Sequence, residues 1–112
     1  MPCMEYEPVK LVKKDFRFTW DEEKAKINLQ KHGVSFYAAA GVFFDDNAYI
    51  GFNSLDRRTG EERFDITGKS ESETMFVVYV ERVTTEYEDV FRIISARRAN
   101  RKEMERYVDG AE

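Results

Sequence analysis

Apolar residues recur along this chain with two spacings, one typical of helices and one typical of strands. Phe16, Phe18 and Trp20 alternate with polar residues and so share one face of a short strand. Stretches with helical spacing follow, and after residue 45 the period returns to two. The pattern predicts, in order, a strand, two helices, four strands and a helix, at residues 16–20, 22–32, 36–44, 48–52, 62–69, 75–82, 90–96 and from 100 onward.

Residues with known capping preferences bracket the expected helices. Asp21 is a favourable N-cap for the first helix, and Gly33 suits the left-handed position after its end. Ser35 can cap the second helix. Asn100 begins the last helix, where Glu103 completes an N-x-x-E version of the capping box.

The expected strands are joined by short segments, which favours antiparallel pairing. Residues 75–82 are apolar on both faces, as in a central strand, and residues 84–89 turn the chain into the next strand. Residues 53–61 are polar and contain the turn formers Asp56 and Gly60, so we expect a loop there. The sequence therefore predicts an α+β fold of order β-α-α-β-β-β-β-α, with a mainly antiparallel sheet packed against helices.

Composition restricts the class of protein. The 112 residues, 42% hydrophobic and 36% charged, suit one globular domain, which we place at residues 16–112 after a flexible extension at residues 1–15. The single cysteine, Cys3, cannot form an internal disulfide. No apolar run has the length of a membrane helix or of a signal peptide, so we expect a cytoplasmic protein without membrane association.

Charge is distributed unevenly. The chain has a net charge of −4, which argues against a purely electrostatic, non-specific nucleic-acid binder. The segment from residue 92 to residue 106 nevertheless carries about +4, because it holds six basic and two acidic residues, and the remainder therefore carries about −8. The basic residues of this segment are Arg92, Arg97, Arg98, Arg101, Lys102 and Arg106.

Arginines on adjacent strands form the first candidate site. Arg63, Arg92 and the pair Arg97–Arg98 fall on neighbouring strands or at their ends, where guanidinium groups could converge on one phosphate. Strict alternation places Arg97 on the face of Phe91 and Ile93. It places Arg98 on the opposite face, with Arg92 and Ile94. Arg97 and Arg98 therefore cannot serve one face unless the strand ends at Ala96. The alternative is that Arg97 pairs with a carboxylate such as Glu103 and holds the last helix in place.

Two further residues have side chains suited to proton transfer. His32, the only histidine, lies at a predicted helix end and could act as a general base or acid, or simply cap the helix. Glu62 opens a strand next to Arg63, where an exposed charge can also serve only solvation. The sequence shows no cluster with metal-ligand spacing and no glycine-rich nucleotide loop, so we expect neither a metal nor another cofactor.

Three separated motifs, in matching order and spacing, resemble the BrnT toxins of bacterial type II toxin–antitoxin systems. The motifs are F-T-W-D-E-E-K-A-K-I-N-L-Q-K-H-G-V-S-F (18–36), G-E-E-R-F (60–64) and R-I-I-S-A-R-R-A (92–99). The resemblance implies a RelE-like fold and a metal-independent endoribonuclease that halts translation. It also implies a BrnA-like ribbon-helix-helix antitoxin as partner, contact with operator DNA only through the antitoxin complex, and allows an oligomer with the antitoxin.

An enzyme of this kind would cleave RNA by attack of the 2′-hydroxyl on the adjacent phosphate. We expect Glu62 or His32 to act as base or acid, and Arg63, Arg92 and Arg97 to stabilise the phosphorane. Further RNA contacts are expected from Arg58, Arg98 and Arg101, and from base stacking on Trp20 and Tyr107, for which core packing is the alternative role. A competing hypothesis is a non-catalytic interaction module that binds a basic partner protein through an acidic, aromatic surface.

Overall fold

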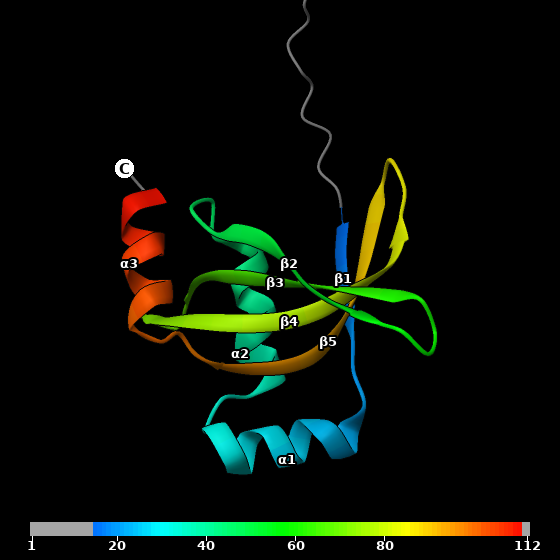
Figure 1. Cartoon of the computed structure of the whole chain (residues 1–112), viewed down its shortest axis with the longest axis horizontal. Coiled ribbons are helices and arrows are strands. Elements are labelled where there is room, and N and C mark those ends of the chain that lie inside the picture. The colour runs from blue at the N-terminus through cyan, green and yellow to red at the C-terminus, as the bar shows by residue number, and fades with distance from the viewer. Residues whose placement is uncertain (1–14, 111–112) are drawn as a thin grey trace, which may run out of the picture.

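The computed structural model describes residues 15–110, which form one five-stranded sheet and three α-helices (Figure 1). The elements follow the predicted order, and the α+β class is confirmed. Of the expected extension at residues 1–15, residues 1–14 lie outside the described part, and Asp15 begins the first strand. The elements are β1 (Asp15–Thr19), α1 (Glu22–His32), α2 (Phe36–Gly41), the 3-10 helix η1 (Val42–Phe44), β2 (Tyr49–Asp56), β3 (Glu61–Ser70), β4 (Glu73–Thr84), β5 (Glu88–Arg98) and α3 (Arg101–Gly110).

The strand order in the sheet is β1-β5-β4-β3-β2, so β1 and β2 are its edges. All neighbours are antiparallel except β1 and β5, which run parallel from Asp15 opposite Glu88 to Thr19 opposite Arg92. The mainly antiparallel sheet predicted from the short connections is confirmed. The parallel pair is possible because the whole chain from α1 to β4 lies between the two strands.

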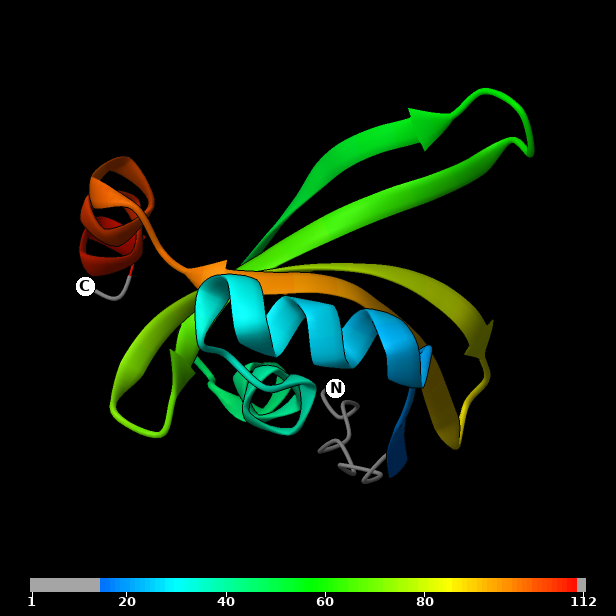
Figure 2. The ribbon, with the colours of Figure 1, turned by 90° about the horizontal axis from the view of Figure 1, so that it is seen from below.

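The hydrophobic core lies between one face of the sheet and the pair α1 and α2 (Figure 2). The helical segments contribute short apolar side chains and one ring, and the central strands contribute every second residue. Fully or nearly fully buried residues of this core are Val34, Phe36, Ala38, Ala39, Val42, Ile66, Met75, Val77, Tyr79, Phe91, Ile93 and Ala96. The alternate residues of the same strands must therefore point to the other face.

Asn28 of α1 replaces a missing neighbour strand at the edge of β5. Strand β1 covers β5 only as far as Arg92, which leaves later backbone groups of β5 without a strand partner. The buried amide of Asn28 donates to the carbonyl of Ala96 at 2.8 Å and accepts from the Ala96 N–H at 3.1 Å. It also donates to the carbonyl of Val34 at 3.0 Å. One side chain thus fixes α1 against the sheet and protects the edge of β5.

The hairpin of β2 and β3 is longer than the sequence predicted. Pairing continues through Ser54–Arg63, Leu55–Glu62 and Asp56–Glu61. The predicted loop at residues 53–61 is therefore wrong, and the turn is confined to residues 57–60. The end of this hairpin projects beyond the rest of the sheet, so polar side chains on it remain in solvent although its backbone is paired (Figure 2).

The second helix ends earlier than predicted. α2 stops at Gly41, and residues 42–44 continue as the tighter 3-10 helix. Gly41 lies so close to β3 that a Cβ added there would overlap the side-chain oxygen of Ser70. The Ser70 hydroxyl also donates to the carbonyl of Ala38 at 2.6 Å. Glycine is unfavourable in a helix interior, but at position 41 it permits close packing of α2 on the sheet.

Among residues 15–110, no helix combines the length and the apolar character that crossing a membrane requires.

Candidate functional site

The sheet face opposite α1 and α2 carries most of the polar side chains of the central strands. We call it the open face. The register orders its residues into three rows that run across the strands, each roughly 7 Å from the next. The rows are the Arg97 row (Tyr49, Thr67, Phe76, Arg97), the middle row (Gly51, Asp65, Val78, Ser95) and the Arg63–Arg92 row (Ser54, Arg63, Val80, Arg92). In the third row Ser54 pairs with Arg63 and Val80 with Arg92, and Arg63 lies one residue beyond the last β3–β4 pair, Phe64–Tyr79.

A β-bulge in β5 determines which face Arg97 joins. β5 contains one extra residue, Ile94, which has no partner in β4. Beyond this bulge the alternation is inverted, so Arg97 no longer follows Phe91 and Ile93. Arg97 shares the open face with Arg92. The predicted grouping of Arg97 with Phe91 and Ile93 is therefore wrong, because strict alternation assumes an uninterrupted ladder.

Arg63 and Arg92 have few partners within the described part of the chain. Arg63 Nη2 lies 3.8 Å from Asp56 Oδ2, which makes a long ion pair. The Nε of Arg63 is buried and has no hydrogen-bond partner among residues 15–110, and the same holds for Oγ1 of Thr67. Arg92 makes no hydrogen bond or ion pair with another described side chain. Arg63 stands one residue beyond the last β3–β4 pair, Phe64–Tyr79, and Arg92 is paired with Val80 of β4. The two arginines therefore flank β4 on one face, and their long side chains can approach the same nucleotide.

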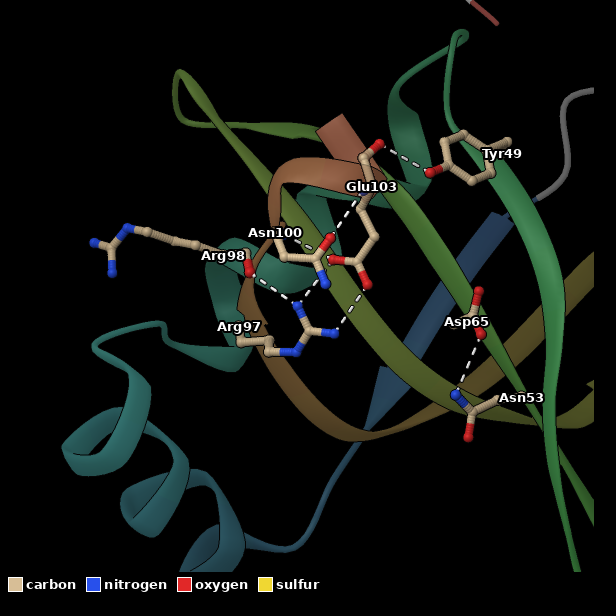
Figure 3. Close-up of polar contacts among 7 residues, drawn as sticks. All are labelled: Tyr49, Asn53, Asp65, Arg97, Arg98, Asn100 and Glu103. Carbon is tan, nitrogen blue, oxygen red and sulfur yellow. Dashed lines mark hydrogen bonds and ion pairs between the residues drawn. The ribbon is translucent and has the colours of Figure 1, made fainter. Parts of the chain in front are cut away.

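Arg97 is engaged by Glu103 of α3 (Figure 3). Its Nη1 and Nη2 donate to the two carboxylate oxygens at 2.8 and 2.9 Å, and Nη1 also donates to the carbonyl of Arg98 at 3.1 Å. The guanidinium carbon lies 4.3 Å from the centre of the Phe76 ring. Hydrogen bonding of the Arg97 guanidinium to the Glu103 carboxylate is the main reason that the pKa of Arg97 is raised. This is the arrangement that the alternative role for Arg97 required, although its side chain is still 37% exposed.

Glu103 connects the start of α3 to the open face. It accepts from the Asn100 N–H at 2.8 Å, and Asn100 Oδ1 accepts from the Glu103 N–H at 2.9 Å, which confirms the predicted capping box. Its backbone carbonyl accepts a hydrogen bond from the Tyr49 hydroxyl at 2.9 Å. Burial opposes the charge of Glu103, but the hydrogen bonds from Arg97 and Asn100 outweigh it and lower the pKa of the carboxyl.

The other basic candidates lie away from the centre of the open face. Arg98 points away from Arg97, and it donates to Glu73 Oε2 at 3.1 Å and to the carbonyl of His32 at 3.2 Å (Figure 3). Arg101 is exposed on α3, with its Nε 3.5 Å from Glu105 Oε2. Arg58 is exposed in the turn between β2 and β3.

Neither candidate for proton transfer lies on the open face. Glu62 alternates with Arg63 along β3, so its side chain leaves the opposite side of the strand. His32 is exposed in the last turn of α1, the helix that packs on the core side, and its carbonyl accepts from Arg98. The structure therefore places Arg63, Arg92 and Arg97 on one face, with Arg97 two rows away from the other two, and does not add Glu62 or His32 to that face.

Trp20 and Tyr107 both make packing contacts. The Trp20 ring meets Phe36 and Tyr37 edge to face, with centroids 5.8 and 5.0 Å away, on the core side of the sheet. Tyr107 is buried and donates a 2.7 Å hydrogen bond to Asp45 Oδ2. This hydrogen bond, together with burial, raises the pKa of Tyr107 to about 12. The contacts agree with the alternative, packing role of both rings.

Three polar residues of the open face were not predicted from the sequence. Tyr49 of β2 contacts Glu103, and Asn53 of β2 contacts Asp65 of β3, whose charge acts on Arg97 (Figure 3). A signal for Asp65 existed, because Arg63, Asp65 and Thr67 alternate with apolar residues. Asn53 had none, because it is the extra residue where the register of β2 shifts. Within residues 15–110, no group of three or more His, Cys, Asp or Glu residues is placed to hold a metal ion.

Comparison with protein families identifies the chain. It matches the family described as "Ribonuclease toxin, BrnT, of type II toxin-antitoxin system" over residues 20–103, which is three quarters of its length. The chain belongs to the BrnT family. No curated protein matches the chain with significant similarity. The matched range of the BrnT chain includes the whole open face and ends at Glu103, the partner of Arg97.

Membership confirms the resemblance noted in the sequence and has two direct consequences. A ribonuclease toxin acts on RNA, so the BrnT family supports endoribonuclease activity for this chain in general terms. A type II toxin–antitoxin system also implies an antitoxin as partner.

Proposed function

We propose that this BrnT protein is a metal-independent endoribonuclease of RelE-like fold that binds and cleaves RNA on its open face. The observation that carries the proposal is the presence of Arg63, Arg92 and Arg97 on one sheet face. Two of them have almost no partner within the described chain. Unpaired guanidinium groups are costly to bury and are well suited to a phosphate, which offers the acceptors they lack.

The proposed reaction uses the RNA's own 2′-hydroxyl as nucleophile. The 2′-oxygen forms a bond to phosphorus while the bond from phosphorus to the 5′-oxygen breaks, which gives a 2′,3′-cyclic phosphate and a 5′-hydroxyl. Arg63 and Arg92 would bind the phosphate oxygens and stabilise the charge that develops on them, and Arg97, two rows further along the open face, would bind a neighbouring phosphate of the strand. Preorganised donors of this kind supply a large part of the rate enhancement of many enzymes.

Proton transfer is assigned to Glu62 or His32 as a hypothesis. Both side chains lie off the open face, so RNA would have to pass around the β2–β3 hairpin to reach Glu62, or around the end of α1 to reach His32. The variants Glu62→Gln and His32→Ala separate the two possibilities through the pH profile of cleavage, because loss of a general base removes the corresponding limb.

The proposed cellular role is inhibition of translation through RNA cleavage in the cytoplasm. A BrnA-like ribbon-helix-helix antitoxin would neutralise the toxin, form an oligomer with it and connect it to operator DNA. Three large apolar side chains that are exposed on edge strand β2, those of Ile50, Phe52 and Leu55, support a role in protein contact. The same observation favours the second candidate function, a non-catalytic module that binds a partner protein.

Cleavage by the isolated chain distinguishes the two functions. We expect purified protein to cut RNA in excess EDTA and to leave 2′,3′-cyclic phosphate ends, because the arginines take the place of a metal. Expression without an antitoxin should stop growth, and the double variant Arg63→Ala/Arg92→Ala should restore it. Intact RNA and undiminished growth, with the folded protein confirmed in the cells, would leave the interaction module as the function.

A further inference from the structure

Asp65 lies at the centre of the face that is proposed to bind RNA phosphates, where a carboxylate is unexpected. It occupies the middle row of the open face, between the row of Arg97 and the row of Arg63 and Arg92. Its charge is close enough to contribute to the raised pKa of Arg97, after the larger effect of Glu103. A carboxylate at this position repels phosphate, so its role in RNA binding must concern another part of the nucleotide.

The middle row leaves space over Asp65. Its four members are Gly51, Asp65, Val78 and Ser95, and all have short side chains. Gly51 stands directly opposite Asp65, and a Cβ added to it would lie 3.3 Å from Asp65 Oδ1. The absence of a side chain at Gly51 therefore keeps that carboxylate oxygen uncovered on the β2 side.

The hydrogen bonds of Asp65 leave acceptor capacity free. Asn53 Nδ2 donates to Oδ2 at 3.2 Å, and no described residue donates from its side chain to Oδ1 (Figure 3). Asn53 is oriented in turn by the Ser54 hydroxyl, which donates to its Oδ1 at 3.0 Å. A carboxylate can accept about four hydrogen bonds, so Asp65 is held from one side and can still accept two donors from a ligand.

We propose that Asp65 recognises a guanine base of the RNA and makes this BrnT protein prefer to bind and cleave next to guanine. Guanine alone presents two adjacent donors, N1–H and N2–H, on its Watson–Crick edge, and these match a carboxylate in the way that an arginine fork does. Adenine and cytosine each offer one donor beside a ring-nitrogen acceptor, and uracil offers one donor between two acceptors. An acceptor next to the carboxylate is repelled.

The rows on either side supply the remaining contacts. Each lies roughly 7 Å from the middle row, which is about the distance between successive phosphates of a single strand. Arg63 and Arg92 on one side and the exposed side of Arg97 on the other can therefore bind the phosphates that flank the recognised base. The inference rests on the proposed function for the cleavage itself, but base recognition can be measured separately as binding.

The test uses short RNAs that cannot be cleaved. Four fluorescent 2′-O-methyl tetranucleotides with a central guanine, 7-deazaguanine, inosine or adenine are titrated with the full chain, and affinity is read as anisotropy. We expect guanine and 7-deazaguanine to bind equally well, since N7 is not read, and inosine and adenine to bind about tenfold or more weakly. Asp65→Asn should lose this preference, whereas Asp46→Asn, an exposed carboxylate outside the open face, should keep it.

Three results would overturn the proposal. Tighter binding of all four RNAs by Asp65→Asn would show that Asp65 only repels phosphate. An unchanged preference in Asp65→Asn, with slower cleavage of every sequence, would make Asp65 a general base. Cleavage by the wild type at all four bases alike, without preferential binding of guanine, would reject base recognition while leaving the ribonuclease in place. Preferential binding of guanine by a chain that cleaves no RNA would support base recognition by Asp65 and reject the proposed ribonuclease activity.

Discussion

Arg63 is the residue on which the ribonuclease proposal depends most strongly. Its Nε is buried and finds no partner among the residues that the structure describes, and its contact with Asp56 is long, so little in that part of the chain depends on its charge. We expect Arg63→Ala to lower the cleavage rate about a hundredfold, the loss typical of one well-placed transition-state donor, with little change in melting temperature. Arg63→Lys should recover only part of the rate, because an ammonium lacks the planar fork.

The control for Arg63 is Lys26→Ala, which removes an exposed positive charge from α1 on the other side of the sheet. Cleavage of a defined RNA and thermal unfolding are measured for each variant. If Arg63→Ala and Lys26→Ala cleave at the same rate, the guanidinium of Arg63 has no place in the active site.

Arg97 has a stability role that can be separated from any role in cleavage. Its two hydrogen bonds to Glu103 fix the start of α3, and Glu103 is only 13% exposed. Removing one partner leaves the other poorly solvated, so Arg97→Ala should lower the free energy of unfolding by about 2 kcal/mol.

The Arg97–Glu103 pair also predicts that stability depends on pH. Because the pKa of Glu103 is lowered in the folded state, its stabilisation is present above the unfolded value of 4.5 and is lost as the pH falls through the folded pKa.

The measurement is the melting temperature of the wild type, Arg97→Ala and Glu103→Gln between pH 3 and pH 7. The advantage of the wild type over Glu103→Gln should be constant near neutrality and shrink below about pH 4.5. A cleavage rate in Arg97→Ala that falls a hundredfold without loss of stability would instead assign Arg97 to phosphate binding alone.

At the scale of elements, local signals predicted the helices better than the strands. The N-caps Asp21 and Ser35 and the left-handed Gly33 are all observed, because capping depends on a few neighbouring atoms. The ends of β2 and β3 were missed because both faces of their hairpin tip meet solvent, which removes the alternation. The bulge at Ile94 could not be read from the sequence, since a bulge is a property of two paired strands.

The turn between β3 and β4 offers a prediction about an element. Glu71 and Ser72 both have positive φ, of 52° and 69°, in a two-residue hairpin turn that favours asparagine and glycine. Non-glycine residues are strained in this region, so Ser72→Gly should raise the free energy of unfolding by about 1 kcal/mol. The cleavage rate should not change, since the turn carries no open-face residue. Chemical denaturation measures the gain, and a loss of stability would show that the entropy of the added glycine outweighs the relief of strain.

At the scale of the whole molecule, the sequence overstated the basic character of the segment from residue 92 to residue 106. Three of its arginines are paired with carboxylates: Arg97 with Glu103, Arg98 with Glu73 and Arg101 with Glu105. The linear count already subtracts Glu103 and Glu105, but it could not show that they pair with Arg97 and Arg101, or that Glu73 of β4 neutralises Arg98. The uncompensated charge of the open face is therefore carried mainly by Arg63, 29 positions before Arg92 in the chain, and by Arg92 itself.

This charge distribution predicts a weak dependence of RNA binding on salt. Each phosphate neutralised on a single strand contributes about −0.7 to the slope of log affinity against log salt. Contacts from Arg63, Arg92 and Arg97 therefore predict a slope of about −2, which is shallow for a nucleic-acid-binding protein but consistent with a chain of net charge −4. The slope is measured with a non-cleavable RNA from 50 to 300 mM potassium chloride. Arg63→Ala should reduce it by about one third, because one of three phosphate contacts is lost. A slope of about −5 that Arg63→Ala leaves unaltered would place the RNA on another surface of the protein.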